Sequence, residues 1–127
     1  MNQIPLIAVV DDDEAVRSAL SSLLRSLGYA VRGYGSAWDF LEDRDHDDPA
    51  CMILDVQMPG MTGAELQARL RSVGRHFPII FMTAFPTDRV RGQVMGAGAS
   101  AYLSKPVDGD TIAQCLATAL LGNDRPQ

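Results

Sequence analysis

Leu6-Ile7-Ala8-Val9-Val10-Asp11-Asp12 is the stretch of sequence that decides the fold. Five apolar residues follow one another without the polar and apolar alternation of a half-exposed strand. Such a run predicts a strand covered on both faces, as in a parallel sheet. The run then changes abruptly to carboxylates. We therefore expect a buried strand that places acidic side chains at its carboxyl end.

Four further segments have the composition of strands. Three are continuous apolar runs that are too short for helices and should also be covered on both faces. The fourth contains Arg32 and Gly33 and tolerates solvent on one side, which is typical of an edge strand. The five expected strands are Leu6–Val10, Ala30–Tyr34, Cys51–Leu54, Ile79–Met82 and Ala101–Leu103.

Between these runs the apolar residues repeat with the period of a helix. The stripes are Val16, Leu20, Leu23, Leu24 and Leu27; then Leu66, Leu70 and Val73; then Ile112, Leu116, Ala119 and Leu120. The expected boundary residues are Gly28 after the first helix, Thr62 with Glu65 before the second, and Asp108 before the third.

Two more helices are expected from weaker signals. A short one begins at Ser36 and turns Phe40 inward. The other spans Thr87–Ala97 and is the least convincing, because Gly92 and Gly96 lie inside it and each costs about 1 kcal/mol relative to alanine. Strand and helix thus alternate five times, which predicts an α/β fold with a doubly wound parallel sheet and helices on both faces.

The composition is that of one ordinary domain. With 127 residues, of which 46% are hydrophobic, the chain can bury a sizeable core without a disulfide or a metal. We expect a single domain over residues 1–127, with its core at about 5–122 and no effector domain. The net charge of −5 argues against direct binding of nucleic acid or anionic lipid, because phosphate recognition depends mainly on lysine and arginine.

Cysteine usage and hydropathy point to a cytoplasmic protein. Cys51 and Cys115 have neither the spacing of a zinc site nor that of a disulfide framework. The N-terminus lacks a basic leader, and no apolar run approaches membrane-spanning length. We expect a protein that is neither exported nor embedded in a membrane.

Polar side chains stand where the expected strands end. Asp11 and Asp12 follow the first strand, Asp55 the third and Thr83 the fourth, while Lys105, the only lysine in the chain, follows the fifth. Ligands of such sheets bind at the carboxyl ends of the strands. Three carboxylates brought together repel one another unless a proton or a cation joins them, and oxygen ligands suit Mg²⁺. The ammonium of Lys105 and the hydroxyl of Thr83 can hold a phosphoryl oxygen.

Other polar and reactive residues are expected to have structural roles. Asp13 and Glu14 should cap the start of a helix. His46 and His76 should lie on the surface, and the two cysteines should be inert core thiols. Each residue at the strand ends could, taken alone, be a cap, a turn former or a solvated charge. Their joint placement indicates a site.

Four motifs occur in order along the chain. They are Val9-Val10-Asp11-Asp12, Leu54-Asp55-Val56-Gln57-Met58-Pro59-Gly60-Met61-Thr62-Gly63, Met82-Thr83-Ala84, and Gly98-Ala99 leading to Tyr102-Leu103-Ser104-Lys105-Pro106. With these motifs the sequence resembles the receiver domain of bacterial two-component response regulators. The resemblance extends from about Pro5 to Gly122 of this chain. The stretch from Val10 to Arg17 is most similar to the FixJ-like branch. The resemblance implies a flavodoxin-like sheet of five parallel strands in the order 2-1-3-4-5.

The resemblance also implies the chemistry of the acidic residues. Asp55 would accept a phosphoryl group from a phosphohistidine on a sensor histidine kinase or phosphotransfer protein. Asp12 and Asp55, with the backbone carbonyl of Gln57, would bind Mg²⁺, and Asp11 would act mainly through metal-bound water. The chain would then be a phosphorylation switch rather than a metabolic enzyme.

The remaining motif residues would respond to the phosphoryl group. Lys105 would pair with the phosphoryl group, and Thr83 would move in to hydrogen-bond it. The resemblance also implies that the Lys105-Pro106 peptide bond is cis. Tyr102 would rotate into the space that Thr83 leaves. A downstream effector or a second copy of the chain would bind the face made by Thr87–Ala97, Ser100–Ser104 and Gly109–Leu121. Gln57 and Phe85 occupy positions that influence dephosphorylation in this family, so the phosphoryl lifetime is not implied.

Two other functions stay open on the sequence. A Mg²⁺-dependent phosphatase of the haloacid dehalogenase type also uses an aspartate after a parallel strand, and Asp11-Asp12-Asp13 has that spacing. However, Glu14-Ala15 follow where such enzymes resemble Asp-x-Asp-Gly-Thr. The second alternative is a receiver-like binding module that is never phosphorylated, although such a module has no need for a metal site. A flavodoxin-like cofactor binder is excluded, because an acidic first loop would repel the cofactor's phosphate.

Overall fold

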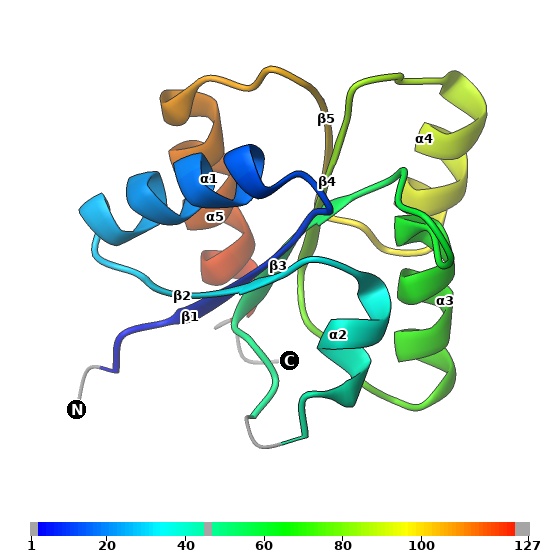
Figure 1. Ribbon diagram of the computed structural model, residues 1–127, viewed down its shortest axis with the longest axis horizontal. Coiled ribbons are helices and arrows are strands. Elements are labelled where there is room, and N and C mark those ends of the chain that lie inside the picture. The colour runs from blue at the N-terminus through cyan, green and yellow to red at the C-terminus, as the bar shows by residue number, and fades with distance from the viewer. Residues whose placement is uncertain (1–2, 45–46, 124–127) are drawn as a thin grey trace.

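Figure 1 shows the computed structural model, which describes residues 3–44 and 47–123. Its centre is a five-stranded, all-parallel sheet in the order β2-β1-β3-β4-β5. The strands are β1 (Leu6–Val10), β2 (Ala30–Tyr34), β3 (Cys51–Asp55), β4 (Ile79–Thr83) and β5 (Ala101–Ser104). The helices are α1 (Glu14–Ser26), α2 (Ala37–Glu42), α3 (Gly63–Ser72), α4 (Asp88–Gly96) and α5 (Gly109–Asn123). The expected fold class and strand order are confirmed.

Helices cover both faces of the sheet. α1 and α5 lie on one face, and α2, α3 and α4 lie on the other (Figure 1). The core under α1 and α5 includes Ile7, Val9, Leu24, Ile53, Ile80 and Leu116. The opposite core includes Val10, Phe40, Leu54, Leu66, Phe81 and Val94. Because β1, β3 and β4 are covered on both faces, their sequences are continuous apolar runs.

Three strands extend one residue beyond their expected ends. β3 includes Asp55, β4 includes Thr83 and β5 includes Ser104. The parallel ladder continues through these positions, since Asp55 pairs with Met82 and Thr83 pairs with Ser104. The polar residues therefore stand on the rigid ladder rather than in the loops after it. β2 is an edge strand, as its polar composition indicated. β5 was wrongly expected to be as buried as the central strands: it is the other edge of the sheet and is only partly buried.

The expected helix caps are present. The Asp39 N–H donates to the Ser36 hydroxyl at the start of α2, and Thr62 with Glu65 forms a complete capping box at α3. The Asp108 carboxylate accepts the Thr111 N–H at the start of α5. Asp13 caps α1 by accepting the Ala15 and Val16 N–H groups, which confirms its structural role.

The last residue of two predicted apolar stripes is exposed rather than buried. Leu27 is 43% exposed and Val73 is 64% exposed. Each is the residue at which its helix ends, α1 and α3 respectively, with the left-handed Gly28 or Gly74 directly after it. Each stripe therefore ends on the residue that caps its helix, and the chain turns away at the glycine that follows.

α4 forms despite its two glycines, but little of it is buried. Its N-terminal cap is Thr87, whose hydroxyl accepts the Val90 N–H. Val94 is the buried residue of this helix, and Gly92 and Gly96 have no atoms of other elements close by. Within residues 3–44 and 47–123, no helix combines the length and the apolar character needed to cross a membrane.

Candidate functional site

The acidic residues at the ends of β1 and β3 meet in space. β1 and β3 are neighbours, with Val10 paired to Leu54, so Asp11 and Asp12 arrive beside Asp55. One carboxylate oxygen from each of the three residues lies within 4.8 Å of the others. Asp11 and Asp55 are buried, at 3% and 6% exposure, whereas Asp12 is exposed to solvent. The predicted cluster of three carboxylates is therefore present.

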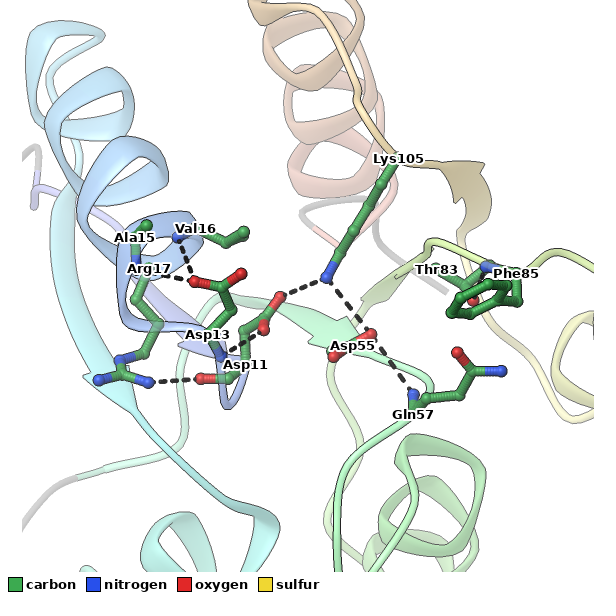
Figure 2. A network of polar contacts seen from close by, with 10 residues as sticks. All are labelled: Asp11, Asp13, Ala15, Val16, Arg17, Asp55, Gln57, Thr83, Phe85 and Lys105. Atoms are coloured by element: carbon green, nitrogen blue, oxygen red, sulfur yellow. Dashed lines mark hydrogen bonds and ion pairs between the residues drawn. The ribbon is translucent and has the colours of Figure 1, made fainter.

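Lys105 reaches into this cluster from the end of β5 (Figure 2). Its Nζ donates to Asp11 Oδ2 at 2.8 Å and lies 3.5 Å from Asp55 Oδ1. Burial lowers the pKa of Lys105, but the hydrogen bond and charge of Asp11, together with Asp55, outweigh burial and raise that pKa above 10.5. Lys105 therefore remains an ammonium. The peptide bond to Pro106 is cis, as the resemblance implied.

The loop after β1 is held by backbone and side-chain hydrogen bonds. The Asp11 N–H donates to the Tyr34 carbonyl of β2 at 3.1 Å, and the Asp13 N–H donates to Asp11 Oδ1 at 2.9 Å. Both carboxylate oxygens of Asp11 are thus engaged, one by Asp13 and one by Lys105. Asp12 has no such partner among residues 3–44 and 47–123, so its carboxylate is available to an added ligand.

Arg17 of α1 also holds this loop, a contact that the sequence did not predict. Its Nη1 donates to the Asp11 carbonyl oxygen at 2.7 Å from the first turns of α1 (Figure 2). The side chain lies over β2 and its end, where a Cβ at Gly33 or Gly35 would be 3.7 or 3.4 Å from it. These are ordinary van der Waals distances, so the arginine packs along this edge of β2. The sequence shows only an arginine six positions after Asp11, and that spacing alone does not predict a hydrogen bond to the Asp11 carbonyl.

The environment of Asp55 makes its carboxylate easier to protonate when no metal is bound. Burial raises the pKa of Asp55, and the nearby Asp11 charge raises it further, to about 6 from 3.8. The Lys105 ammonium and the Gln57 N–H, which donates to Asp55 Oδ1 at 3.4 Å, partly oppose this rise. A cation at the site would stabilise the ionised form.

The raised pKa of Asp55 predicts a pH dependence of stability in the metal-free protein. The folded state binds the Asp55 proton more tightly than the unfolded state does, so this group's contribution to stability is greatest below about pH 4 and is lost as the pH rises to about 6. Asp55→Asn has no such proton. In urea unfolding with chelator, the variant should gain free energy of unfolding over the wild type as the pH rises. A difference that does not change with pH would contradict the assignment.

The loop after β3 is shaped by close packing. Met58 and Met61 are buried and anchor it to the core under α2, α3 and α4. The Gly63 N–H donates to the Val56 carbonyl at 2.8 Å, which brings the start of α3 against the end of β3. A Cβ at Gly63 would overlap the Asp55 carbonyl oxygen and lie 3.1 Å from the Val56 Cα. Glycine at this position is what lets α3 start so close to Asp55.

Thr83 and Tyr102 lie on the side of the site toward α4. Thr83 is fully buried, and its Oγ1 accepts the Phe85 N–H at 3.0 Å (Figure 2). Its own hydroxyl proton stays available for donation, because a hydroxyl both accepts and donates. The Tyr102 hydroxyl accepts the Thr87 N–H at 3.1 Å, and its ring packs against the core beneath α4 while remaining partly exposed.

The cluster fits a divalent cation of the Mg²⁺ type. Opposite ligands of Mg²⁺ are about 4.2 Å apart, since each Mg–O bond is about 2.1 Å. The three carboxylate oxygens lie within 4.8 Å of one another, so they can converge on one such cation, directly or through bound water. When ionised, three carboxylates against one ammonium leave two negative charges, which a divalent cation neutralises.

The described residues that were expected to lie outside the site do so. His76 is exposed, whereas His46 lies outside the described residues. Cys51 is buried in β3, where burial raises the pKa of its thiol to about 12, and Cys115 is partly exposed on α5. A thiol with so high a pKa is not a nucleophile at neutral pH, which agrees with the structural role expected for Cys51.

Comparison with known proteins identifies the family. A family model described as "Response regulator receiver domain" matches residues 7–117. The chain belongs to this family. The response regulator protein TmoT of Ectopseudomonas mendocina is 39% identical to this receiver domain, over 94% of this chain and 54% of TmoT. The transcriptional regulatory protein FixJ of Azorhizobium caulinodans is 38% identical, over 90% of this chain and 54% of FixJ.

Solved structures agree with this assignment. The response regulator StyR superposes on the receiver domain with a TM-score of 0.84 at 38% identity, over 95% of this chain and 61% of that one. A structure titled FixJ-N superposes with a TM-score of 0.84 at 29% identity, over 95% and 96%. The expected family and its likeness to FixJ are confirmed. The chain spans about half the length of the curated relatives that it matches.

Proposed function

We propose that this receiver domain is a phosphorylation switch in which Asp55 is the phosphoacceptor. The donor is a phosphohistidine on a sensor histidine kinase or phosphotransfer protein, and the reaction depends on Mg²⁺. The proposal rests on one observation: Asp55, two further carboxylates and the sole lysine of the chain meet at the carboxyl edge of the sheet. The setting is cytoplasmic, where both thiols would stay reduced.

The chemical step is an in-line displacement at phosphorus. A carboxylate oxygen of Asp55 forms the new O–P bond, the P–N bond of phosphohistidine breaks, and its electron pair stays on the imidazole nitrogen. The transition state is loose, with charge spread over the equatorial phosphoryl oxygens, so positioning and positive charge account for most of the catalysis. Asp12, Asp55 and the Gln57 carbonyl would hold Mg²⁺, which supplies positive charge to those oxygens, and Asp11 would contribute through bound water.

Lys105 and Thr83 have complementary parts in this proposal. The Lys105 ammonium lies between Asp11 and Asp55 and can move from their oxygens to a phosphoryl oxygen without leaving the site. Thr83 has a hydroxyl proton to donate, and its Oγ1 is held by the Phe85 N–H. Donation to a phosphoryl oxygen would require Thr83 to turn toward Asp55. These two residues therefore distinguish the phosphorylated from the unphosphorylated state.

The output surface of the proposed switch is the face of α4, β5 and α5. Movement of Thr83 leaves space beside β4, and Tyr102 on the neighbouring β5 would turn into it, giving up the Thr87 N–H at the start of α4. A ligand shifts such an equilibrium only through contacts that differ between the two states. The face that changes would then recruit a downstream effector protein or a second copy of the domain.

Intact mass spectrometry tests the proposed function. Incubation with a small acyl phosphate donor and Mg²⁺ should add one phosphoryl group to the protein, and hydroxylamine should remove it, since an aspartyl phosphate is an acyl phosphate. Chelator in place of Mg²⁺ should prevent the addition. No mass increase would exclude the switch. Rapid turnover of a generic phosphomonoester would favour the phosphatase alternative instead.

Mg²⁺ is expected to raise the melting temperature of the wild-type protein. At ten times its dissociation constant, a ligand that binds only the folded state stabilises it by about 1.4 kcal/mol, or about 5 °C for a domain of this size. Asp12→Ala should lose most of this gain, because its exposed carboxylate is the one available to the metal. Thermal unfolding with and without Mg²⁺ measures both.

The matched control is Asp13→Ala, one residue along. Asp13 caps α1 and is not part of the carboxylate cluster. Its removal should lower the melting temperature without Mg²⁺, because a lost cap costs about 1 kcal/mol, and leave the Mg²⁺ gain intact. An equal Mg²⁺ gain in Asp12→Ala and in the wild type would place the metal elsewhere.

A further inference from the structure

α4 is held at both ends by side chains from other elements. At its start the Thr87 N–H donates to the Tyr102 hydroxyl of β5. At its end the Gln67 Nε2 of α3 donates to the Val94 carbonyl oxygen at 3.0 Å. α3 and α4 lie side by side on one face of the sheet (Figure 1). Tyr102 belongs to the site already described, whereas Gln67 has no role so far.

The Val94 carbonyl is part of the structure that ends α4. Gly98 has a φ of 103°, and its N–H donates to the Met95 carbonyl, while the Ala99 N–H donates to the Val94 carbonyl at 3.0 Å. This is the pattern of a Schellman motif, which closes the last turn of a helix. A carbonyl oxygen has two lone pairs. The Val94 carbonyl uses one for this motif and accepts the Gln67 amide with the other.

Gln67 occupies a position where an amide is costly. The residue is 4% exposed and is one of four buried polar or charged residues in the described chain, the other three being Asp11, Asp55 and Thr83 of the site. A buried amide is unfavourable unless it is hydrogen-bonded. An apolar side chain would fill this place without that requirement, so the contact of the amide with α4 is the feature that distinguishes Gln67.

α3, the helix that carries Gln67, is firmly anchored to the rest of the domain. Gln67 lies one turn after Gly63 in α3, and the start of α3 is packed against the backbone of Asp55 and Val56. Leu66 and Leu70, which flank Gln67 on the buried side of α3, are at most 1% exposed. α4, in contrast, has one buried residue and two glycines. The bond therefore joins a well-anchored helix to a weakly anchored one.

We propose that Gln67 is a positioning residue that clamps the end of α4 in the unphosphorylated state and thereby opposes the switch. This inference rests on the proposed function for its regulatory part. α4 can leave its place only if the Gln67–Val94 bond breaks, because the bond acts between two elements. The intrahelical bonds of α4 move with the helix and set no such requirement. The clamp thus contributes to the free energy that phosphorylation must supply to move α4.

Gln67→Met tests the clamp directly. Methionine has a similar length and flexibility but no donor, and the Val94 carbonyl keeps the Ala99 N–H, so no buried group is left without a partner. Gln93→Met is the matched control, since Gln93 is exposed on α4. By hydrogen exchange, residues 88–99 should exchange about fivefold faster in Gln67→Met, because a net hydrogen bond contributes about 1 kcal/mol. α1 should be unchanged in both variants. Equal rates in residues 88–99, or a uniform increase that includes α1, would overturn the clamp.

A phosphoryl mimic tests the regulatory part. Beryllofluoride with Mg²⁺ should bind Gln67→Met several-fold more tightly than the wild type, because the variant populates the binding-competent state more often, and Gln93→Met should match the wild type. Faster exchange with unchanged mimic affinity would overturn the opposition to the switch. Failure of the mimic to bind the wild-type protein would instead refute the proposed function, and the regulatory part with it, while the exchange rates would still report on the clamp.

Discussion

Gly63→Ala is expected to be strongly destabilising, because Gly63 is the glycine of the described residues at which an added methyl group would overlap backbone atoms. The new Cβ would overlap the Asp55 carbonyl oxygen and crowd the Val56 Cα, and backbone atoms cannot swing aside as a side chain can. Relief requires moving the start of α3 away from β3, which would break the bond from the Gly63 N–H to the Val56 carbonyl. We expect a loss of about 3 kcal/mol or more, measured as the midpoint of urea unfolding.

Gly92→Ala is the matched control for this substitution. Gly92 lies inside α4 at a negative φ, and a Cβ there would meet nothing within 4 Å apart from the adjoining backbone of its own helix. Alanine should therefore stabilise the protein by about 0.5–1 kcal/mol through helix propensity. If Gly63→Ala unfolds at the same urea concentration as Gly92→Ala, the close approach of α3 to Asp55 is not as described.

Asp55→Asn is expected to have the largest effect on chemistry. An amide oxygen is a far poorer nucleophile than a carboxylate, so phosphoryl labelling should fall to background, a loss on the order of 10⁴-fold. The fold should persist, because asparagine has nearly the same shape and removes one of three mutually repelling charges. Labelling measured by intact mass over time provides the comparison.

Asp39→Asn is the control for that experiment. Asp39 is exposed on α2 and does not belong to the carboxylate cluster, so the same chemical change there should leave labelling at the wild-type level. Circular dichroism of both variants shows whether the fold is kept. Full labelling of Asp55→Asn would remove Asp55 from its assigned role.

Features repeated along the chain made the fold predictable. The central strands are buried on both faces, so their continuous apolar runs stand out from the helical stripes between them. Because parallel strands share one carboxyl edge, the sequence alone was enough to place residues as distant along the chain as Asp11 and Lys105 at the same edge of the sheet. The strand order came from the resemblance to receiver domains and not from the alternation of elements, which fits several orders.

Contacts between single side chains and distant backbone were not predictable. Arg17 and Gln67 act on the carbonyls of Asp11 and Val94, and no pattern in the sequence marks a hydrogen bond between a side chain and a backbone group of another element. The need for glycine at position 63 depends on the exact approach of α3 to β3. The exposure of Leu27 and Val73 was not predictable either, because a helical period does not show where the helix ends.

Chemical mapping of the acceptor residue tests the central claim most directly. The wild-type protein is labelled with a small acyl phosphate donor and Mg²⁺, reduced with borohydride, digested and sequenced by tandem mass spectrometry. Borohydride converts an aspartyl phosphate to homoserine and so marks the residue that carried the phosphoryl group. The account predicts homoserine at position 55, which depends on both donor and Mg²⁺. Homoserine at position 11 or 12, or at no aspartate of a protein that has gained the phosphoryl mass, would contradict it.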